Sequence, residues 1–259
     1  MGSGLLSIKT SSDFAKMTVA GRVVAELHTE VRAAAHPGVS LKSLDVIAEK
    51  VVRSNDCRPS FLGYQGTYPA TICTSVNSMI VHGIPTEYEL REGDILSIDA
   101  GAIYAGWHGD AAFTMGIGEI SQEAQQLIDV TERALWNGLA EVKPGNRIGD
   151  IGAAVEATAK PYGYGVVQGY TGHGIGQAMH EAPSVPNYGR ARRGFKLREG
   201  MALAIEPMFN LGTPDTAVLD DDWTVVTADG AWSAHWEHTV GLTPDGSFVF
   251  TLPEPKQVA

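Results

Sequence analysis

The sequence has few cysteines, few basic residues and no long apolar run. Cys57 and Cys73 are the only cysteines among 259 residues, which excludes a disulfide-based fold and predicts reduced thiols. No stretch reaches the roughly 18 consecutive apolar residues of a membrane span. The N-terminal MGSGLLSIKT also lacks the layout of a secretory signal. These absences predict a cytoplasmic protein that does not bind membranes.

The shortage of basic residues leaves a net charge of −11, from 19 lysines and arginines against 30 aspartates and glutamates. A chain this acidic is not expected to bind DNA. One basic segment, GRARRGFKLR at 189–198, departs from this pattern. It is typical of a solvated loop, and the alternative is a transient ribosome contact through Arg190–Arg198. A monomer is the default expectation.

Four segments carry apolar residues at helical spacing. Ser11 and Ser12 provide an N-terminal cap for the first, and HPG at 36–38 ends it. The third ends before Pro144-Gly145. The predicted helices cover residues 11–35, the segment after Ser40, 122–142 and 147–159.

An internal repeat relates two parts of the chain. Pro37-Gly38 recurs 107 residues later as Pro144-Gly145, and REGDILSID at 91–99 recurs at the same offset as REGMALAIE. We therefore expect one α+β domain over residues 1–259, with halves at about 11–115 and 122–250 related by a pseudo-twofold axis. Their strands should join into a central antiparallel sheet covered by helices on one side.

The repeat aligns acidic residues with acidic residues. Asp99 ends the first REG segment and Glu206 ends the second, and a returning strand in each half carries Asp110 or Glu237. Strand pairing would bring these four carboxylates together near the axis. Carboxylates that lie so close need raised pKa values or bound cations. They can bridge two divalent ions about 3.5–4 Å apart, an arrangement used in metal-assisted hydrolysis.

His173 lies in GHGIGQAMHEAP at 172–183, where Gly172 and Gly174 allow close approach of the backbone. A lone histidine is more often a core or surface residue than a ligand. Beside four converging acids, however, a neutral imidazole suits a transition metal. Five ligands with one nitrogen favour two divalent ions over one, and disfavour a cysteine-rich structural zinc site.

Five segments of the chain form a set: VHGIP at 81–85, SIDAGAIYAGWHGDAAFT at 97–114, GHGIGQAMHEAP at 172–183, AIEPMF at 204–209 and WSAHWEHTV at 232–240. In this order they resemble the signature segments of the type I methionine aminopeptidases, and the resemblance covers nearly the whole chain. It implies the two-halved pita-bread (creatinase/aminopeptidase) fold. It also implies removal of the initiator methionine from nascent proteins, favoured when the second residue is small.

By this resemblance, the metal ligands would be Asp99, Asp110, His173, Glu206 and Glu237. Asp110 and Glu237 would bridge two divalent ions. His173 and Glu206 would belong to one ion, and Asp99 to the other. Glu206 would also accept a proton from the metal-activated water that attacks the first peptide carbonyl. His82 and His180 would contact the substrate and stabilise the tetrahedral intermediate. Co, Mn, Fe and Zn all suit such a site, and the sequence does not identify the native ion.

The resemblance also implies a pocket for the first side chain. Aromatic and sulfur-containing walls suit a flexible thioether, although each aromatic residue taken singly is more often part of a core. No arrangement of cysteine, histidine and asparagine supports a nucleophilic role for Cys73. The implied pocket residues are Phe61, Tyr64, Tyr68, Cys73, His82, Met179, His180 and Trp223.

Four residues depart from the family pattern. Phe61 replaces a smaller residue, Thr67 is a one-residue insertion in the pocket loop, and Ser78 stands where an acidic residue is common. These three leave the dimensions of the pocket open. His235 stands where glutamine is usual and leaves the environment of Glu237 open.

Two other functions compete with this interpretation. Proline-specific dipeptidases and aminopeptidases resemble the family in fold and ligands, but they carry an extra N-terminal domain. Fewer than 100 residues precede Asp99 here. A non-catalytic binding protein of the same fold would typically lose ligands, whereas this chain keeps all five together with His82 and His180.

Overall fold

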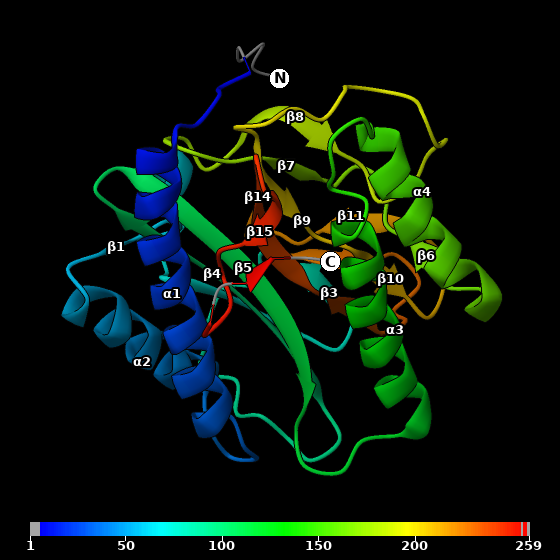
Figure 1. Ribbon diagram of the computed structural model, residues 1–259. Coiled ribbons are helices and arrows are strands. Elements are labelled where there is room, and N and C mark those ends of the chain that lie inside the picture. The colour runs from blue at the N-terminus through cyan, green and yellow to red at the C-terminus, as the bar shows by residue number, and fades with distance from the viewer. Residues whose placement is uncertain (1–5, 255, 258–259) are drawn as a thin grey trace.

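The computed structural model describes residues 6–254 and 256–257. Two pairs of helices cover one side of a large sheet (Figure 1). None of the described helices has the length and hydropathy that a membrane span requires. The pairs are α1 (Ser11–Ala34) with α2 (Leu41–Ser54), and α3 (Gln122–Leu139) with α4 (Ile148–Ala159).

The first helix pair lies where the sequence predicts it, with one correction at the start of α1. The N-cap is Thr10, not Ser11 or Ser12. Asp13 decides this, because its side chain accepts from the Thr10 backbone while the Thr10 side chain accepts from the Asp13 backbone. Ser40 caps α2 with its side chain, as expected.

The second helix pair is also confirmed, and its ends shift slightly. α3 ends at Leu139 rather than at residue 142. The chain tightens there, because the Glu141 N–H donates to the Gly138 carbonyl instead of to a residue four positions earlier. Arg147, the first residue of the predicted fourth helix, is the N-cap of α4.

Within the described residues, the main sheet has ten strands, and its central path is β1–β4–β5–β14–β9–β7–β8 with antiparallel pairing throughout. β2 also pairs with β4, β15 with β14, and β16 with β15. The strands are β1 (Arg58–Pro59), β2 (Ile72–Val76), β4 (Ile95–Tyr104), β5 (Trp107–Gly116), β7 (Gly172–Gly174), β8 (Glu181–Val185), β9 (Ala202–Ile205), β14 (Glu237–Thr243), β15 (Gly246–Val249) and β16 (Lys256–Gln257).

Two three-stranded sheets adjoin the main sheet, in the orders β13–β10–β6 and β11–β12–β3. Their strands β10 to β13 come from the segment between β9 and β14. The bounds are β3 (Met79–Val81), β6 (Gly165–Val166), β10 (Met208–Asn210), β11 (Thr216–Val218), β12 (Val225–Thr227) and β13 (Ser233–His235), with 3₁₀ turns at Tyr64–Gly66 and Lys160–Tyr162.

The core lies between the main sheet and the helices. Ile98 and Phe113, from β4 and β5, belong to the apolar cluster of α1 and α2. Ile205 and Val240, from β9 and β14, belong to the apolar cluster that contains Leu135 of α3. Burial of this apolar area holds the helices on one face of the sheet. Because strand residues alternate between faces, the neighbouring positions point to the opposite side.

Candidate active site

Three of the ligands expected from the sequence lie on the face of the sheet opposite to the helices. Asp99 of β4 pairs with Ala112 of β5, two residues after Asp110. Glu237 of β14 pairs with the same Ala112 from the other side. Directly paired residues share a face, and so do residues two apart on one strand. The side chains of Asp99, Asp110 and Glu237 therefore point the same way.

The remaining two ligands reach that face through β7 and β9. His173 pairs with Ala204, and Ala204 pairs with Thr239, two residues after Glu237. Glu206 follows Ala204 by two residues and comes directly after β9. The alternation rule thus places His173 and Glu206 on the same face as Glu237.

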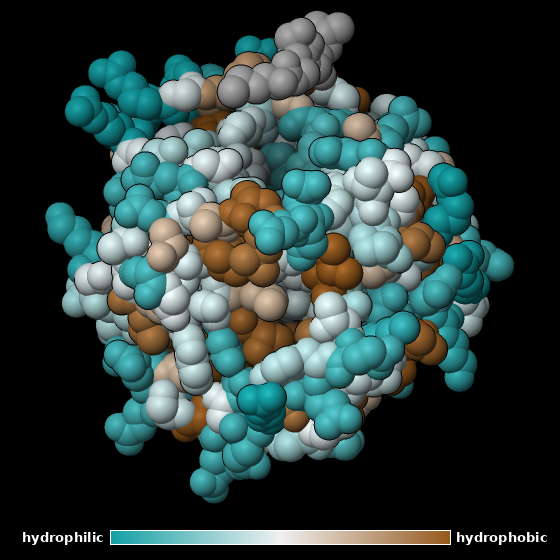
Figure 2. Space-filling view, turned by 180° about the vertical axis from the view of Figure 1, so that it is seen from behind, coloured by the Kyte–Doolittle hydropathy of each residue, from teal (hydrophilic) through white to brown (hydrophobic). Residues whose placement is uncertain are grey.

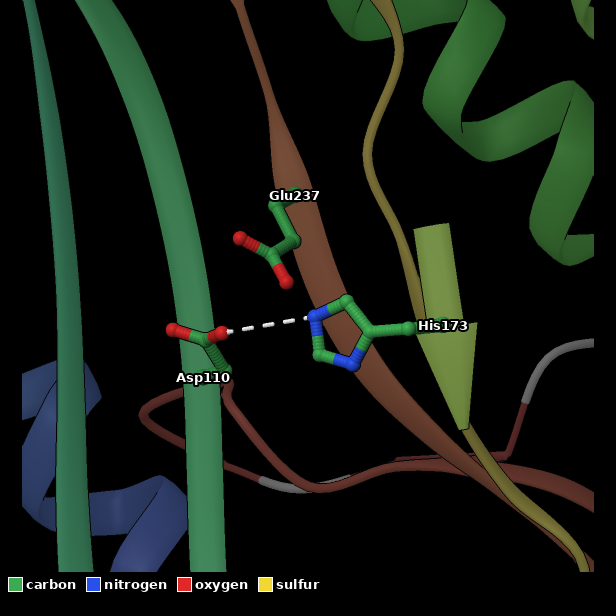
Figure 3. A group of neighbouring side chains, drawn as sticks. All are labelled: Asp110, His173 and Glu237. Atoms are coloured by element: carbon green, nitrogen blue, oxygen red, sulfur yellow. Dashed lines mark ion pairs between the residues drawn. The ribbon is translucent and has the colours of Figure 1, made fainter. Parts of the chain in front are cut away.

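Distances show that these side chains converge. The His173 Nε2 atom lies 3.9 Å from Asp110 Oδ2 and 3.6 Å from Glu206 Oε1. One ligand atom each from Asp110, His173 and Glu237 lies within 4.8 Å of the others. Figure 3 shows these three side chains directed at a common point from three different strands. All five expected ligands line one cavity.

In the metal-free site, burial strongly raises the pKa values of the four expected carboxylate ligands. Burial raises the pKa of Asp99 to about 7. Burial and the neighbouring carboxylates raise the pKa values of Asp110, Glu206 and Glu237 well above their ordinary range. Burial is the main cause for all four groups, because each negative charge loses water; for Asp110, Glu206 and Glu237 the neighbouring negative charges add to it. Bound cations would therefore strongly stabilise the ionised form of these four carboxylates.

The donor set fits divalent cations. The side-chain oxygens Asp99 Oδ1, Asp110 Oδ1 and Glu237 Oε1 are buried, and no hydrogen-bond partner for them exists among the described residues. The His173 Nδ1–H donates to the Gly174 carbonyl at 2.8 Å, which leaves the Nε2 lone pair directed at the acids. Burial lowers the pKa of His173 to about 3, so the ring is neutral, as a metal ligand must be.

A cross-strand hydrogen bond fixes Asp110 relative to Glu237. The Thr239 hydroxyl donates to the Asp110 carbonyl at 2.7 Å and accepts from the Asp110 N–H at 2.9 Å. Thr239 is fully buried. This double contact sets the offset between β5 and β14, on which the spacing of the two acids depends.

The ligands form the floor of a cavity of about 350 Å³. Figure 2 views the molecule from the side away from the helices, where apolar side chains gather near the middle of the face. Gln65 also lines the cavity, and sequence reasoning missed it because a polar residue in a loop carries no periodic signal. The other lining residues are those expected from the sequence, namely Phe61, Tyr64, Tyr68, Cys73, His82, Met179, His180 and Trp223.

Aromatic rings build the pocket wall around Trp223. Its ring centroid lies 5.1 Å from that of Tyr68, 6.3 Å from that of His82 and 6.5 Å from that of Tyr64. Tyr68 and Phe61 are buried and meet edge to face at 6.4 Å. The contacts hold rigid apolar surfaces on one side of the cavity, against the carboxylates on the other.

His82 and His180, which are not expected ligands, both line the cavity. The Nδ1 atom of His180 lies 2.6 Å from the Tyr64 hydroxyl, and its ring is 4.2 Å from the His173 ring. His82 has φ 61°, a left-handed conformation that strains a non-glycine residue. Burial lowers the pKa of His180, and it lowers the pKa of His82 to about 4. Both rings are neutral at pH 7.

The four departures from the family pattern lie at different distances from the chemistry. Phe61 lines the cavity, and Thr67 directly follows the 3₁₀ turn of the pocket loop. Ser78 lies in the turn between β2 and β3, where its carbonyl accepts from the Thr227 N–H. Buried His235 is 3.9 Å from Glu206 through its Nε2 atom, which has no hydrogen-bond partner in the described part of the chain.

Both cysteines are buried and free. Cys73 pairs with Asp99 across β2 and β4, and burial raises its pKa well above the ordinary value. A thiol held protonated in this way is a poor nucleophile. Cys73 therefore serves as part of the pocket wall.

Comparison with known proteins agrees with this geometry. Residues 15–244 match the family described as "Metallopeptidase family M24". The chain is 49% identical over 258 residues to methionine aminopeptidase 1 of Mycobacterium tuberculosis, with 97% of each chain covered. It is 44% identical over 247 residues to methionine aminopeptidase 1 of Bacillus subtilis, with 95% of this chain and 99% of that one covered.

Solved structures give the same result. The crystal structure of methionine aminopeptidase from Rickettsia prowazekii matches with a TM-score of 0.93 at 41% identity, covering 96% of this chain and 100% of that one. Prolidase from Pyrococcus furiosus matches with a TM-score of 0.76 at 20% identity, covering 95% of this chain and 66% of that one. The second likeness shows the fold alone. The predicted pita-bread fold and the resemblance to methionine aminopeptidases are confirmed, and the chain belongs to metallopeptidase family M24.

Proposed function

We propose that this chain is a metal-dependent aminopeptidase that removes the initiator methionine from nascent proteins and prefers a small second residue. The observation that carries the proposal is the single cavity in which the five expected metal ligands face an aromatic and sulfur-containing pocket. The pocket suits an unbranched thioether side chain. The acids at its floor suit divalent cations and a free α-amino group.

Two divalent ions fit the carboxylate set better than one. Asp110 and Glu237 lie between the halves and would bridge both ions. His173 and Glu206 would complete the site of one ion, and Asp99 that of the other. When bound, such ions supply a water of lowered pKa and polarise a carbonyl oxygen. Co, Mn, Fe and Zn are all candidates, because each accepts carboxylate and imidazole ligands.

Glu206 is the group that would move the proton. Its Oε1 and Oε2 atoms face His173 and His235, at 3.6 Å and 3.9 Å. Burial and nearby acids raise its pKa in the metal-free site. Bound cations would favour its ionised form, and an ionised carboxylate beside the attacking water can accept a proton. Glu206 would take a proton from the attacking water and deliver it to the departing amine.

The histidines His82 and His180 would act on the substrate itself. Both line the cavity and both are neutral, so each can offer one N–H to the oxygen of the first peptide carbonyl. A preorganised donor at that oxygen stabilises the negative charge that develops in the transition state. Tyr64, in contact with His180, fixes the orientation of that ring.

Hydrolysis of short peptides by metal-loaded protein tests the proposed function. We expect release of methionine from Met-Ala-Ser with Mn²⁺ or Co²⁺, its loss on chelation, and its recovery when metal is returned. The proline-specific alternative predicts faster hydrolysis of an Xaa-Pro dipeptide. A binding protein of the same fold predicts no hydrolysis of either peptide with any of the four metals.

We also propose that the chain acts as a monomer in the cytoplasm and contacts the ribosome transiently through Arg190–Arg198. All five basic side chains of this loop belong to exposed residues. The loop is held on the start of α4, where Asp150 Oδ1 accepts from the Arg192 N–H at 2.7 Å and the Gly149 N–H donates to the Arg193 carbonyl at 3.0 Å. A fixed basic surface suits phosphate contacts.

Sedimentation with ribosomes tests this contact. Replacing Arg190, Arg192 and Arg193 by glutamine should reduce co-sedimentation at low salt and leave hydrolysis of Met-Ala-Ser unchanged. Binding should also weaken steeply as salt rises, because phosphate contacts release counterions. Co-sedimentation that is equal for both proteins would contradict the proposal.

A further inference from the structure

One buried ion pair lies outside the ligand group but next to the cavity. The side chain of Lys9 is 2% exposed, and its Nζ atom lies 2.7 Å from Glu181 Oε2. The Ser7 hydroxyl donates to the same oxygen at 2.7 Å. Burial of a lysine is costly unless its charge is matched. The contact with Glu181 therefore offsets the cost of burying Lys9, which lies in the segment before α1.

Glu181 closes a tight turn. Its Oε1 atom accepts from the Ala178 N–H at 3.2 Å, and the Gly176 N–H donates to the Ala178 carbonyl at 3.1 Å. The Gly176 carbonyl accepts from the His108 N–H at 2.9 Å, which ties the turn to β5. Both carboxylate oxygens of Glu181 are thus in use, one inside the turn and one toward the N-terminal segment.

Lys9 passes directly over the turn. A Cβ atom built on Gly176 would lie 2.7 Å from Lys9 Cε and 2.6 Å from Glu181 Oε1. A side chain at position 176 would therefore displace the ends of both the Lys9 and the Glu181 side chains. The backbone of Lys9 is fixed as well, because its N–H donates to the Gly200 carbonyl at 2.7 Å. The turn is therefore clamped from outside the cavity.

Met179 and His180 lie between Ala178 and Glu181, the two residues joined by the turn's hydrogen bond. Both line the cavity. His180 immediately precedes Glu181, and its ring stands 4.2 Å from that of ligand residue His173. A shift of the Glu181 backbone would move the His180 ring with it. A misplacement of about 1 Å in a reacting constellation can lower a rate on the order of 100-fold.

We propose that Lys9 and Glu181 form a positioning pair that holds the 176–181 turn, and with it Met179 and His180, in register with the substrate. Buried ion pairs are weak evidence for stability, because hydrophobic replacements of equal volume are often neutral or stabilising. Their best supported use is to select one arrangement. The pair links the segment before α1 to a turn of the second half. The catalytic effect inferred for it rests on the proposed function.

The charge state of the pair agrees with this role. Burial alone raises the pKa of Glu181, yet the hydrogen bonds from Lys9 and Ser7 outweigh it and lower that pKa below its ordinary value. Burial lowers the pKa of Lys9, and contact with Glu181 opposes the change. A matched control exists in Lys42 and Glu87, which form an exposed pair at 2.9 Å with side chains 63% and 75% exposed.

The test compares Lys9→Met, Glu181→Gln and the double variant with Lys42→Met, in metal-loaded protein. We expect kcat/KM for Met-Ala-Ser to fall by about 10–100-fold in the first two, with most of the loss in kcat because His180 acts on the developing charge. The double variant should be no worse than the worse single variant, since both remove the same contact. Lys42→Met should match the wild type, and metal affinity should be unchanged in every variant.

Hydrogen exchange supplies a readout that does not depend on hydrolysis. The amides of residues 178–180 should exchange faster in Lys9→Met and Glu181→Gln than in the wild type or in Lys42→Met. Unchanged exchange in the turn, or a loss of thermal stability with unaltered kcat and KM, would overturn the proposal. A wild-type protein that hydrolyses no peptide would instead count against the proposed function, and the exchange result would still decide the role of the pair. Glu181→Gln serves where Lys9→Met does not fold, because its amide oxygen can still accept from the Ala178 N–H and its amide nitrogen can donate to the Ser7 hydroxyl.

Discussion

The two halves of the sheet deliver their acids to the site by different routes. In the first half, Asp99 and Asp110 lie on β4 and β5, a continuous hairpin paired from Ile95–Gly116 to Tyr104–Trp107. In the second half, Glu206 and Glu237 lie beside β9 and on β14, and the chain leaves the main sheet between them. That excursion forms β10 to β13 and carries Trp223 and His235.

The difference shows what each route adds. A tight hairpin places two acids and little else, because its residues are used in pairing. A long excursion places two acids and also brings a pocket wall and a further histidine to the cavity. We propose that the halves are repeats whose acids are equally required in the metal site but whose connections divide the remaining tasks. Substitutions in the two halves test whether both sets of acids are required and how the remaining tasks are divided.

The largest effect is expected from removing one acid from either half. Glu206→Ala should lower kcat for Met-Ala-Ser by roughly 10²–10⁴-fold, the range of a positioned acid–base group. Asp110→Asn should lower it at least as much, because it removes a carboxylate expected to hold both ions. Glu49→Gln on α2, which alters a partly exposed carboxylate outside the cavity, provides a control that should keep full activity. If one half tolerated the change while the other did not, the acids would not be equally required.

The next effect concerns one histidine from each half. His82→Ala and His180→Ala should each lower kcat by about 100-fold, because each removes a donor aimed at the developing oxyanion. Metal affinity measured by calorimetry should stay at the wild-type value, since neither ring is an expected ligand. A large loss of metal affinity in either variant would mean that its histidine is a ligand.

Metal binding should stabilise the fold in a pH-dependent manner. Burial raises the pKa of Asp99 to about 7, against about 3.9 in an unfolded chain. Protonation of Asp99 therefore contributes to the stability of the metal-free fold. The contribution is complete below about pH 4 and is lost as the pH rises through 7. Metal at a thousandfold excess over its Kd should add about 4 kcal/mol at pH 8, or roughly 8–16 °C in Tm. The gain should be smaller at pH 5, and equal gains at both pH values would contradict the raised pKa.

The smallest effect is expected at the contact between the halves. Thr239→Val removes the double hydrogen bond to Asp110 and should cost about 1–3 kcal/mol in the free energy of unfolding. Thr243→Val, which removes the Thr243 hydroxyl bond to Gly246 within the β14–β15 hairpin, is the matched control. Metal affinity should fall in Thr239→Val only. Equal metal affinity in both variants would show that the offset between β5 and β14 does not depend on Thr239.

Much of this site could be predicted from the sequence because its signals are periodic. The repeat of REG segments aligns Asp99 with Glu206. Strand alternation then predicts that the ligands lie on the same face of the sheet. The cap of α1 was misplaced by one or two residues because three adjacent polar residues compete, and only Asp13 selects Thr10. Such local choices depend on a reciprocal contact that composition does not show.

Other parts of the site depend on contacts between distant residues and carry no periodic signal. Lys9 and Glu181 lie 172 positions apart, and Gln65 reaches the cavity from an irregular turn with φ 48°. The sequence raised His235 as a departure beside Glu237, whereas the structure puts its Nε2 atom near Glu206. Tertiary packing fixes these neighbours, and a single sequence does not encode it in any short window.

The central claim is that carboxylates of both halves jointly hold a pair of divalent ions. An anomalous difference map from a crystal of this protein grown with Mn²⁺ tests it most directly. We predict two peaks about 3.5–4 Å apart in the cavity, both in contact with Asp110 and Glu237, with His173 on one and Asp99 on the other. A cavity without a peak, or a peak held by residues of one half alone, would contradict the account.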